Sequence, residues 1–432
     1  MYLRRVSLKN VRCFKDVVIE FDKPANNEAP LTVIVGDNAT GKTTLLKAIA
    51  MGLCDESSAA SLMKESDAGY IRKDERKARI AVDLCTKGGT PNYRVTTTIK
   101  KTLSGEQRLR QTKYRLGKNT RPIKSFPWDR LFVAGYGAGR GTAGTGDIVE
   151  YSVLNAVYSL FNYSEGLQNP ELSLLRIRNP KSRALVMRAL RDFTKTDKIE
   201  LMGRGIVVAG IWGRDMPLRD LADGYKASLM WLTDFLGWAI GKFPSASNSR
   251  DLSGIVLIDE IEQHLHPKWQ ETVLDRLCQI FPRVQFILTT HSPLVAAKAG
   301  KIGGDGGRSL IHLELKEGNV VTAKDVPSLR GSRADQVLAS EAFDYVITSD
   351  REIEDVLREA SRLSTKGQKR TQKEERLYRK LKKEIAEKVI LAEPETQVER
   401  EIEAELDRRL ARRLRKVQHK IWDQGHDSNK AK

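Results

Sequence analysis

The sequence predicts an α/β protein whose core is a parallel sheet covered by helices. Three continuous apolar runs favour this class: Leu31–Val35, Gly254–Glu260 and Val284–Ser292. Such runs are typical of strands that are buried on both faces. A helical pattern after Pro267 separates the second run from the third, and the order strand, helix, strand indicates parallel pairing.

The first run leads into a glycine loop. Residues Gly36, Gly41, Lys42 and Thr43 fit the pattern G-x-x-x-x-G-K-[ST] between a strand and a helix. In this pattern backbone N–H groups and the helix N-terminus surround phosphate oxygens, the lysine reaches the β- and γ-phosphates, and the threonine hydroxyl binds Mg2+. The alternative is a strand-to-helix turn that binds nothing, and the flanking elements favour the phosphate site.

Composition limits the classes of protein. The 432 residues suffice for a large α/β domain with a smaller appendage. No apolar run has the length of a membrane span, and the first residues lack the core of a signal peptide, so we expect a cytoplasmic protein. The four cysteines have no C-x-x-C spacing, which favours reduced thiols over a zinc site.

The charge points to the kind of partner. The formal net charge of +18 favours polyanions such as nucleic acid. Residues 72–140 alone carry eighteen Lys or Arg against five Asp or Glu, a net of +13. This basic segment therefore holds most of the excess.

The elements before residue 152 read as mostly β. Residues 3–21 alternate as a half-buried hairpin does. After the first helix, the polar stretch 56–78 indicates a loop or a mobile segment. Residues 78–86 and 92–103 predict strands, and a basic hairpin turns at Ser104–Gly105.

The next segments are glycine-rich and then helical. Residues 130–146 combine a short apolar strand with a long loop that lacks the lysine of a second phosphate loop. We expect this loop near the nucleotide and assign Tyr136 and Arg140 no role. From Ser152 to about Met202 the apolar spacing is helical, with a break at Pro170.

The tail from about residue 351 differs in kind, because nearly half of its residues are charged. Apolar side chains recur at helical spacing, for example at Leu377 and Leu381, and at every fourth position between Val398 and Leu414. We interpret the tail as an amphipathic helical appendage that packs on the core or on a partner. A DNA-binding arm is the alternative.

Asp259 and Glu260 end the second apolar run. At a strand end the first carboxylate can hold Mg2+ through water, and the second can orient or deprotonate an attacking water. Alone, such a pair is more often a solvated charge, but beside a phosphate loop it predicts a catalytic pair. His291 follows the third run, where a neutral imidazole could sense the γ-phosphate; a packed polar residue is the alternative.

A fourth motif begins at Leu221. The sequence LADGYKASLMWL places a tight Asp223–Gly224 turn before a helix, so that backbone N–H groups could meet phosphate oxygens. An ordinary helix start is the alternative. The order GDNATGKTT, LADGYK, VLIDEIEQHLHP, TTHSP resembles the ABC-type ATPase heads of the SMC/RecF group. It is similar in particular to stand-alone ATPases of phage-defence systems such as Septu and the overcoming-lysogenization-defect family.

The resemblance covers residues 1–50 and 215–300 and implies a fold. That fold is a P-loop NTPase head of the ABC type, with a parallel core sheet, an antiparallel β subdomain, a helical insertion and a helical C-terminal appendage. We expect the head at residues 1–340, with the basic insertion at 55–215, and the charged helical region at 341–432.

The resemblance also implies that two heads sandwich ATP. The residues that would bind ATP in cis are Gly36, Asn38, Gly41, Lys42, Thr43 and Thr44, with Thr43 and Asp259 at Mg2+. The residues that would contact the γ-phosphate across the dimer are Ala222, Asp223, Gly224 and Lys226. Glu260 would be the general base, His291 the switch residue, and residues 262–267 the segment that touches the opposing subunit.

The chain departs from the family pattern in three respects. The signature usually has Ser where this chain has Ala222, and losing one hydroxyl contact could weaken nucleotide closure by about 1–3 kcal/mol and slow turnover. No glutamine loop can be identified. The long coiled coil of chromosome-structuring relatives is missing.

Three functions compete. The first is an ATP-dependent dimeric or higher oligomeric switch, which senses nucleic acid through residues 72–140 or an infection signal. It would control a separate effector, such as an HNH-type nuclease, in phage defence. The second is an ATP-locked scaffold with little turnover, or an ATPase of DNA repair. The third, an intrinsic nuclease, is disfavoured because no apolar strand ending in D-x-D follows His291.

Overall fold

The computed structural model of the chain divides into two compact units, Met1–Val346 and Ile347–Lys432. In the first unit it describes residues 1–326 apart from 26–27, 87–89, 141–150, 163–166, 203–204, 211–214, 301–307 and 317–319. Beyond residue 326 it describes 329, 332, 336–337, 340, 343, 363, 371 and 374–381.

A six-stranded sheet forms the centre of the first unit. Its order is β15-β14-β3-β13-β12-β8, and every neighbouring pair is parallel except β14 with β15. The strands are β3 (Leu31–Gly36), β8 (Val133–Tyr136), β12 (Gly254–Ile258), β13 (Val284–Thr289), β14 (Arg308–Lys316) and β15 (Val320–Val326). The strand that precedes the glycine loop therefore lies inside the sheet, between β13 and β14.

The core sheet is buried on both faces. Val33 and Val35 belong to the hydrophobic core on one face, whereas Ile34 belongs to the core on the other. Because alternate side chains of a strand point to opposite faces, burial of both faces requires an unbroken apolar run. The predicted parallel core sheet is thus confirmed.

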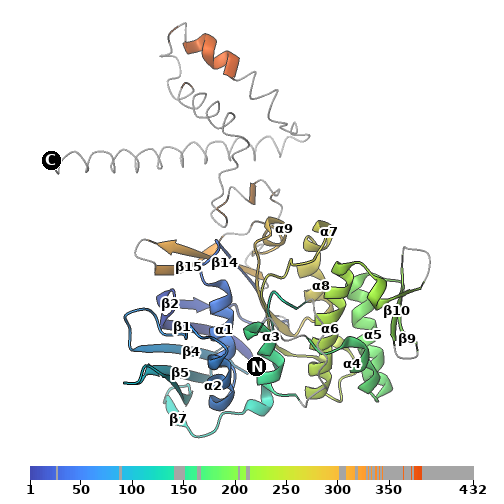
Figure 1. Ribbon diagram of the computed structural model, residues 1–432, viewed down its shortest axis with the longest axis horizontal. Coiled ribbons are helices and arrows are strands. Elements are labelled where there is room, and N and C mark those ends of the chain that lie inside the picture. Colours follow the sequence, from blue (N-terminus) through green and yellow to red (C-terminus); the bar gives the residue numbers. More distant parts are fainter. Residues whose placement is uncertain are drawn as a thin grey trace, which may run out of the picture. The chain divides into compact units, whose positions relative to one another are not determined.

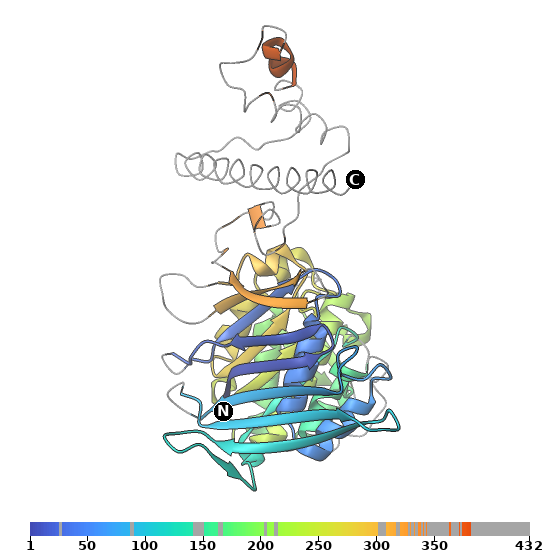
Figure 2. The ribbon, with the colours of Figure 1, turned by 90° about the vertical axis from the view of Figure 1, so that its left-hand side faces the viewer.

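A second, antiparallel sheet covers one side of the first. Its order is β2-β1-β4-β5-β6-β7, and Figure 2 shows it face on. The strands are β1 (Tyr2–Val11), β2 (Phe14–Glu20), β4 (Lys77–Cys85), β5 (Tyr93–Lys101), β6 (Gln107–Arg115) and β7 (Arg121–Ile123). Helix α1 (Lys42–Gly52) lies between the two sheets, in one core with both. The predicted antiparallel subdomain and its hairpins are confirmed.

The prediction of a loop over residues 56–78 is wrong for its first half. Residues Glu56–Lys64 form helix α2. The side chain of Asp55 caps this helix by accepting from the backbone N–H groups of Ser57 and Ser58, which satisfies two of the donors that a helix start leaves without partners. Ala59, Leu62 and Met63 are its buried residues, so a short apolar face is enough to hold it.

The helices that follow the glycine-rich segment cover the other face of the core sheet (Figure 1), except the first of them, which packs on β8 beside α1 and α2. The helices after the glycine-rich segment are α3 (Val153–Phe161), α4 (Pro170–Arg176), α5 (Pro180–Thr194), α6 (Asp223–Lys242), α7 (Pro267–Gln270), α8 (Val273–Ile280) and α9 (Pro293–Ala296). Short 3-10 turns lie at Trp128–Arg130, Leu218–Asp220 and Ser249–Asp251. Pro170 starts α4 at a position where its missing N–H costs nothing.

The prediction of helical structure from Ser152 to about Met202 is wrong for its last residues. Lys198–Met202 forms strand β9, which joins β10 (Gly205–Ala209) and β11 (Met216–Pro217) in a small antiparallel sheet. The single helix expected after Pro267 is likewise two helices, α7 and α8. The four cysteines, all within the described ranges, form no disulfide.

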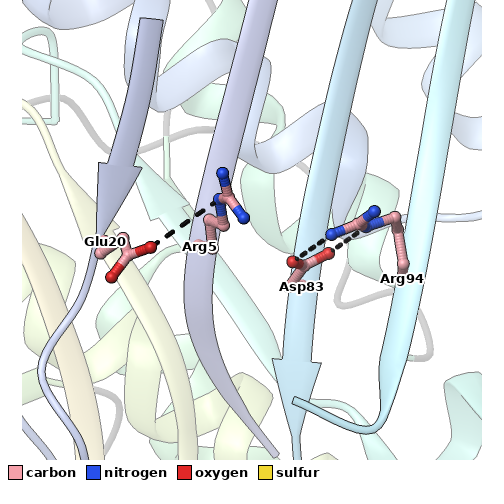
Figure 3. Close-up of polar contacts among 4 residues, drawn as sticks. All are labelled: Arg5, Glu20, Asp83 and Arg94. Atoms are coloured by element: carbon pink, nitrogen blue, oxygen red, sulfur yellow. Dashed lines mark hydrogen bonds and ion pairs between the residues drawn. The ribbon is translucent and has the colours of Figure 1, made fainter. Parts of the chain in front are cut away.

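Charged side chains alternate across the outer face of the antiparallel sheet (Figure 3). Register places Glu20, Arg5, Asp83 and Arg94 opposite one another on β2, β1, β4 and β5. Arg94 donates to both oxygens of Asp83, at 2.5 and 2.7 Å. Arg5 and Glu20 are 4.0 Å apart, and the Glu20 side chain is 71% exposed against 6% for Asp83, so the two pairs differ in strength.

In the second unit residues 374–381 are helical. Leu363 and Leu381 are buried there with Tyr378 beside them, as the predicted apolar position at Leu381 requires. Leu377, predicted for the same apolar face, is 39% exposed. The other predicted helical positions of the tail, including Val398 to Leu414, lie outside the described residues. The domain boundary at residue 340 stays a prediction.

Candidate nucleotide site

The glycines of the loop stand where a side chain has no room. Gly41 has φ +92°, and a Cβ there would lie 2.4 Å from Sγ of Cys13 and 2.9 Å from the ring of Phe14. Gly36 has φ +151°, and its Cβ would lie 2.5 Å from the carbonyl oxygen of Leu313. Only glycine tolerates both conditions. The loop is therefore held between the β1–β2 turn and strand β14.

Lys42 folds back into the loop. Its Nζ donates to the carbonyl oxygens of Gly36 and Asp37 at 2.7 and 2.9 Å. Burial lowers the pKa of Lys42, although Asp259 and Glu260 oppose that shift. The ammonium group thus lies inside the loop, where its charge would meet an anion.

A chain of hydroxyls and a carboxylate joins the loop to the two neighbouring strand ends. The hydroxyl of Thr43 donates to Oδ2 of Asp259 at 2.6 Å, and the hydroxyl of Thr289 donates to Oδ1 at 2.6 Å. Asp259 is almost completely buried. Both carboxylate oxygens are therefore fixed in direction.

This pair has the donor chemistry of a Mg2+ site. A hydroxyl, a carboxylate, phosphate oxygens and water are the oxygen ligands that Mg2+ takes in nucleotide sites. Within the described ranges no group of three or more His, Cys, Asp or Glu side chains forms a metal site. Thr43 and Asp259 would therefore share the ion with phosphate and water.

Glu260 has a constrained backbone. Its φ is +47°, in the left-handed region that non-glycine residues seldom adopt. Its N–H donates to the hydroxyl of Thr289 at 2.8 Å. Arg140 donates to the carbonyl oxygens of Asp259 and Glu260, at 2.6 Å each. Arg140 is 3% exposed, and burial lowers its pKa to about 10.

His291 follows strand β13 and lies at the same site as Asp259 and Glu260. Its backbone N–H donates to Oε1 of Glu262 at 2.6 Å, while the hydroxyl of Thr290 donates to Oε2 at 2.7 Å. Glu262 therefore fixes the turn that carries the histidine. The imidazole is exposed to the cavity described next.

One cavity of about 440 Å³ collects these side chains. Its lining residues are Arg12, Cys13, Asn38, Ala39, Gly41, Lys42, Thr43, Thr44, Asp259, Glu260 and His291. The predicted cis residues meet there, with Gly36 behind them as a partner of Lys42. They come from the carboxyl ends of parallel strands, where ligands bind in open α/β sheets.

Arg12 is a lining residue that the motifs did not reveal. Its guanidinium stacks 4.3 Å over the ring of Tyr70 and lies 3.5 Å from the hydroxyl of Thr44. It also donates to the carbonyl oxygen of Gly69 at 2.8 Å. A cation fixed at the rim suits an anionic ligand. The only sequence signal was its position in the turn that precedes the phosphate-loop strand.

The turn at residues 222–226, called the signature turn below, does not line this cavity. Ala222 is the N-cap of α6, with no side-chain hydrogen bond, and is exposed. A Cβ on Gly224 would lie 2.6 Å from the carbonyl oxygen of His264. Asp223 and Lys226 form an exposed ion pair of 3.6 Å. In the described part of the chain, the residues predicted to act across the dimer (Ala222, Asp223, Gly224 and Lys226) therefore lie outside the cavity. Gly224 lies next to His264, in the segment 262–267 that was predicted to touch the opposing subunit.

Tyr136, which received no role, is a structural residue. It is buried, and its hydroxyl donates to Oδ2 of Asp234 on α6 at 2.9 Å. Asp234 also accepts from the N–H of Gln168 at 3.0 Å. Burial raises the pKa of Asp234 to about 6. This hydrogen bond connects helix α6 to strand β8 at the edge of the core sheet.

The fold and the site are similar to those of the ABC-type ATPase heads of the SMC/RecF group. Residues 5–126 match the family model described as "AAA domain". Residues 213–297 match the model described as "AAA domain, putative AbiEii toxin, Type IV TA system". Together with the relatives below, these matches confirm the predicted resemblance.

The chain is also similar to a Septu protein and to a retron probable ATPase. It is 26% identical over 346 residues to the Septu protein PtuA of Bacillus mycoides, an alignment that spans 79% of this chain and 45% of that protein. It is 24% identical over 376 residues to the retron Ec83 probable ATPase of Escherichia coli, with 67% and 68% coverage. The chain thus spans less than half of the Septu relative.

The chain is also similar in fold to solved structures, of which one is an SMC head domain. The SMC head domain of Thermotoga maritima aligns with a TM-score of 0.43 and 17% identity, over 76% of this chain and 99% of that one. No helix in the described part of the chain is long and apolar enough to cross a membrane.

Proposed function

We propose that the chain is a cytoplasmic ATPase that binds ATP with Mg2+ and hydrolyses it between two copies of itself. The observation that carries this proposal is the 2.6 Å hydrogen bond from Thr43 to Asp259 in one cavity with Lys42, Glu260 and His291. These side chains follow three neighbouring strands of the core sheet, whose carboxyl ends bring them to one edge. Their combination matches what phosphoryl transfer to water requires.

Each residue has a role in this proposal. Lys42 leaves the carbonyls of the loop and binds the β- and γ-phosphates. Thr43 and Asp259 hold Mg2+, which supplies charge neutralisation at the phosphate oxygens. Glu260 orients and deprotonates the attacking water, and His291 senses the γ-phosphate. The roles of Asn38 and Thr44 are backbone and side-chain contacts to phosphate.

The second copy completes the site. At the start of α6, Ala222 and Asp223 are exposed and Gly224 and Lys226 are partly exposed, and none of the four lines the cavity of its own chain. A helix N-terminus with exposed N–H groups suits a phosphate presented by another molecule. We propose a homodimer closed by ATP, or a higher oligomer built from such dimers.

The test compares two variants. Lys42→Ala should lose ATP binding, measured by titration with a fluorescent ATP analogue. Glu260→Gln should bind ATP like the parent, lose about 100- to 10,000-fold in hydrolysis, and accumulate as a dimer in size-exclusion chromatography with ATP. If Glu260→Gln hydrolyses ATP at the parent rate, the proposed catalytic role is wrong.

We further propose that the ATPase controls a separate effector in defence against phage. The similarity to a Septu protein and to a retron ATPase supports this proposal, and an HNH-type nuclease is the effector that the resemblance suggests. The test is co-purification with the products of neighbouring genes, with and without ATP. Recovery of no effector from either state would contradict the proposal.

Nucleic acid is the proposed ligand of the basic segment. Register places Lys77, Lys100 and Arg108 opposite one another on β4, β5 and β6, and Lys9 opposite Arg79 on β1 and β4. All five are exposed on the outer face of the antiparallel sheet. Cations in such rows bind phosphates with an affinity that falls steeply with salt.

A charge reversal tests this face. Lys77→Glu with Lys100→Glu should weaken binding to DNA or RNA at low salt by at least tenfold in a filter assay. The matched control is Lys181→Glu with Arg188→Glu, which makes the same change in charge at two exposed positions of α5 and should leave affinity near the parent value. No binding by the parent at low salt, or equal loss in both variants, would reject the assignment.

The second candidate function is an ATP-locked scaffold with little turnover. The observation that favours it is that Ala222, the N-cap of α6, lacks the hydroxyl of the usual serine and makes no side-chain capping hydrogen bond. In a scaffold, ATP binding alone would recruit the partner, so Glu260→Gln would recruit it as well as the parent does. In a switch, Glu260→Gln would hold the partner in one state and abolish the response to ATP hydrolysis.

A further inference from the structure

Arg140 is a buried cation aimed at the backbone of the catalytic pair. Its Nη1 donates to the carbonyl oxygen of Asp259 and its Nη2 to that of Glu260, both at 2.6 Å. Nη1 also contacts the carbonyl oxygen of Gly137 at 3.3 Å. The side chain is 3% exposed. A guanidinium hidden this deeply is stable only where its donors are used.

The contacts lie where the sheet ends. Strands β8 and β12 pair in parallel, and the last ladder bond runs from the N–H of Asp259 to the carbonyl oxygen of Tyr136 at 2.8 Å. The register of the two strands ends at Tyr136 and Ile258. Arg140, which follows β8, continues the connection through its side chain to the carbonyl oxygens of Asp259 and Glu260, which follow β12.

That residue is in an unfavourable conformation. Glu260 has φ +47°, which for a non-glycine residue costs on the order of 1 kcal/mol or more and persists only when its neighbours impose it. Two contacts impose it here. Thr289 accepts from the N–H of Glu260 at 2.8 Å, and Arg140 donates to its carbonyl. The backbone on both sides of the Glu260 Cα is therefore held.

We propose that Arg140 is a positioning residue for hydrolysis, which clamps the backbone of Asp259 and Glu260 so that the Glu260 carboxylate points at the attacking water. The inference rests on the proposed role of Glu260 as general base. A guanidinium suits this task because its planar fork meets two carbonyls at once. A lysine keeps the charge and loses the fork.

The variants therefore separate charge from geometry. Arg140→Lys should bind ATP within about threefold of the parent and lose at least 30-fold in kcat, because small misplacement of a catalytic group costs on the order of 100-fold. In the Glu260→Gln background, Arg140→Lys should reduce the residual rate by less than threefold, since residues that act as a unit are not additive.

A second arginine provides the matched control. Arg276 donates to the carbonyl oxygen of Phe193 at 2.5 Å, half-buried and outside the cavity. Arg276→Lys should leave kcat and ATP affinity near the parent values. Thermal melting of all variants shows whether folding is kept. Where Arg140→Ala fails to fold, Arg140→Lys still carries the test.

The outcomes distinguish the clamp from the proposed function. If Glu260→Gln is inactive while Arg140→Lys hydrolyses ATP like the parent, the clamp is refuted and the ATPase assignment stands. If Arg140→Lys loses ATP binding and melting temperature together with kcat, its role is structural and the clamp is refuted. If Glu260→Gln keeps the parent rate, the ATPase assignment fails first, and the clamp fails with it.

Discussion

The hydroxyl of Thr43 donates to Oδ2 of Asp259 at 2.6 Å, although the two residues are 216 positions apart in the chain. The bond joins the start of α1 to the end of β12. The bond thus brings together the hydroxyl and the carboxylate to which we assign Mg2+ in the proposed function.

Thr43→Val tests this arrangement. Valine matches the shape of threonine and removes the hydroxyl, so the Mg2+-dependent part of ATP affinity should fall by about 10- to 100-fold, the usual loss when a metal site is disturbed. Isothermal titration with and without Mg2+ measures it. ATP affinity in EDTA should stay near the parent value; an equal loss in EDTA would mean that the loop itself is damaged.

Ala222→Ser should have two separate effects. A serine at the N-cap of α6 can accept from a backbone N–H and stabilise the fold by about 1 kcal/mol. In a closed dimer its hydroxyl could also contact the γ-phosphate and raise hydrolysis by up to about tenfold, the equivalent of one hydrogen bond. Thermal melts and ATPase assays measure the two effects.

Ala222→Gly separates them, because glycine caps nearly as well as serine and has no hydroxyl. It should be more stable than the parent without a gain in rate. A serine variant that is stabilised but no faster would place the signature turn away from the nucleotide.

The Asp83–Arg94 pair should matter more to stability than its neighbour in Figure 3. The Asp83 side chain is 6% exposed and that of Arg94 36% exposed. Removing one partner of a fully buried pair costs about 3–5 kcal/mol, so with one half-exposed partner we expect about 2 kcal/mol for Asp83→Asn. Glu20→Gln, in a pair of 4.0 Å whose side chains are 41% and 71% exposed, should cost under about 0.5 kcal/mol. Urea denaturation compares them, and equal costs would contradict the argument.

Asp234 gives an unusual pH dependence. Burial raises its pKa to about 6 from 3.8, so between these values the folded state binds a proton that the unfolded state has lost. Its contribution to the free energy of unfolding therefore falls as pH rises from about 4 to about 6, by roughly 3 kcal/mol, and is constant above.

Asp234→Asn removes this titration. The stability of the parent minus that of the variant, from urea denaturation at several pH values, should decline over the interval from pH 4 to pH 6. A difference that is flat or rises with pH would show that Asp234 is ionised in the fold at low pH.

Much of the core could be predicted because burial on both faces leaves a direct sequence trace. The runs at β3, β12 and β13 contain scarcely a polar residue, and the glycine loop follows the first of them. The cis residues could be placed for the same reason, since strand ends of one parallel sheet share an edge. Their roles remain proposals.

The features that could not be predicted depend on contacts that leave no pattern in the amino-acid sequence. Helix α2 is mostly polar and is fixed by the Asp55 cap and a few apolar contacts. Arg140 donates to backbone carbonyls, which every residue possesses, so no sequence motif marks its targets. Arg12 lies beside Thr44 only because β1 and α1 are brought together by the antiparallel sheet.

The close approach of Gly224 to the carbonyl of His264 also bears on engineering. Two stretches that are forty residues apart in the sequence meet there without room for a methyl group. A chimera that takes the turn at the start of α6 from a Septu relative must therefore keep glycine at position 224.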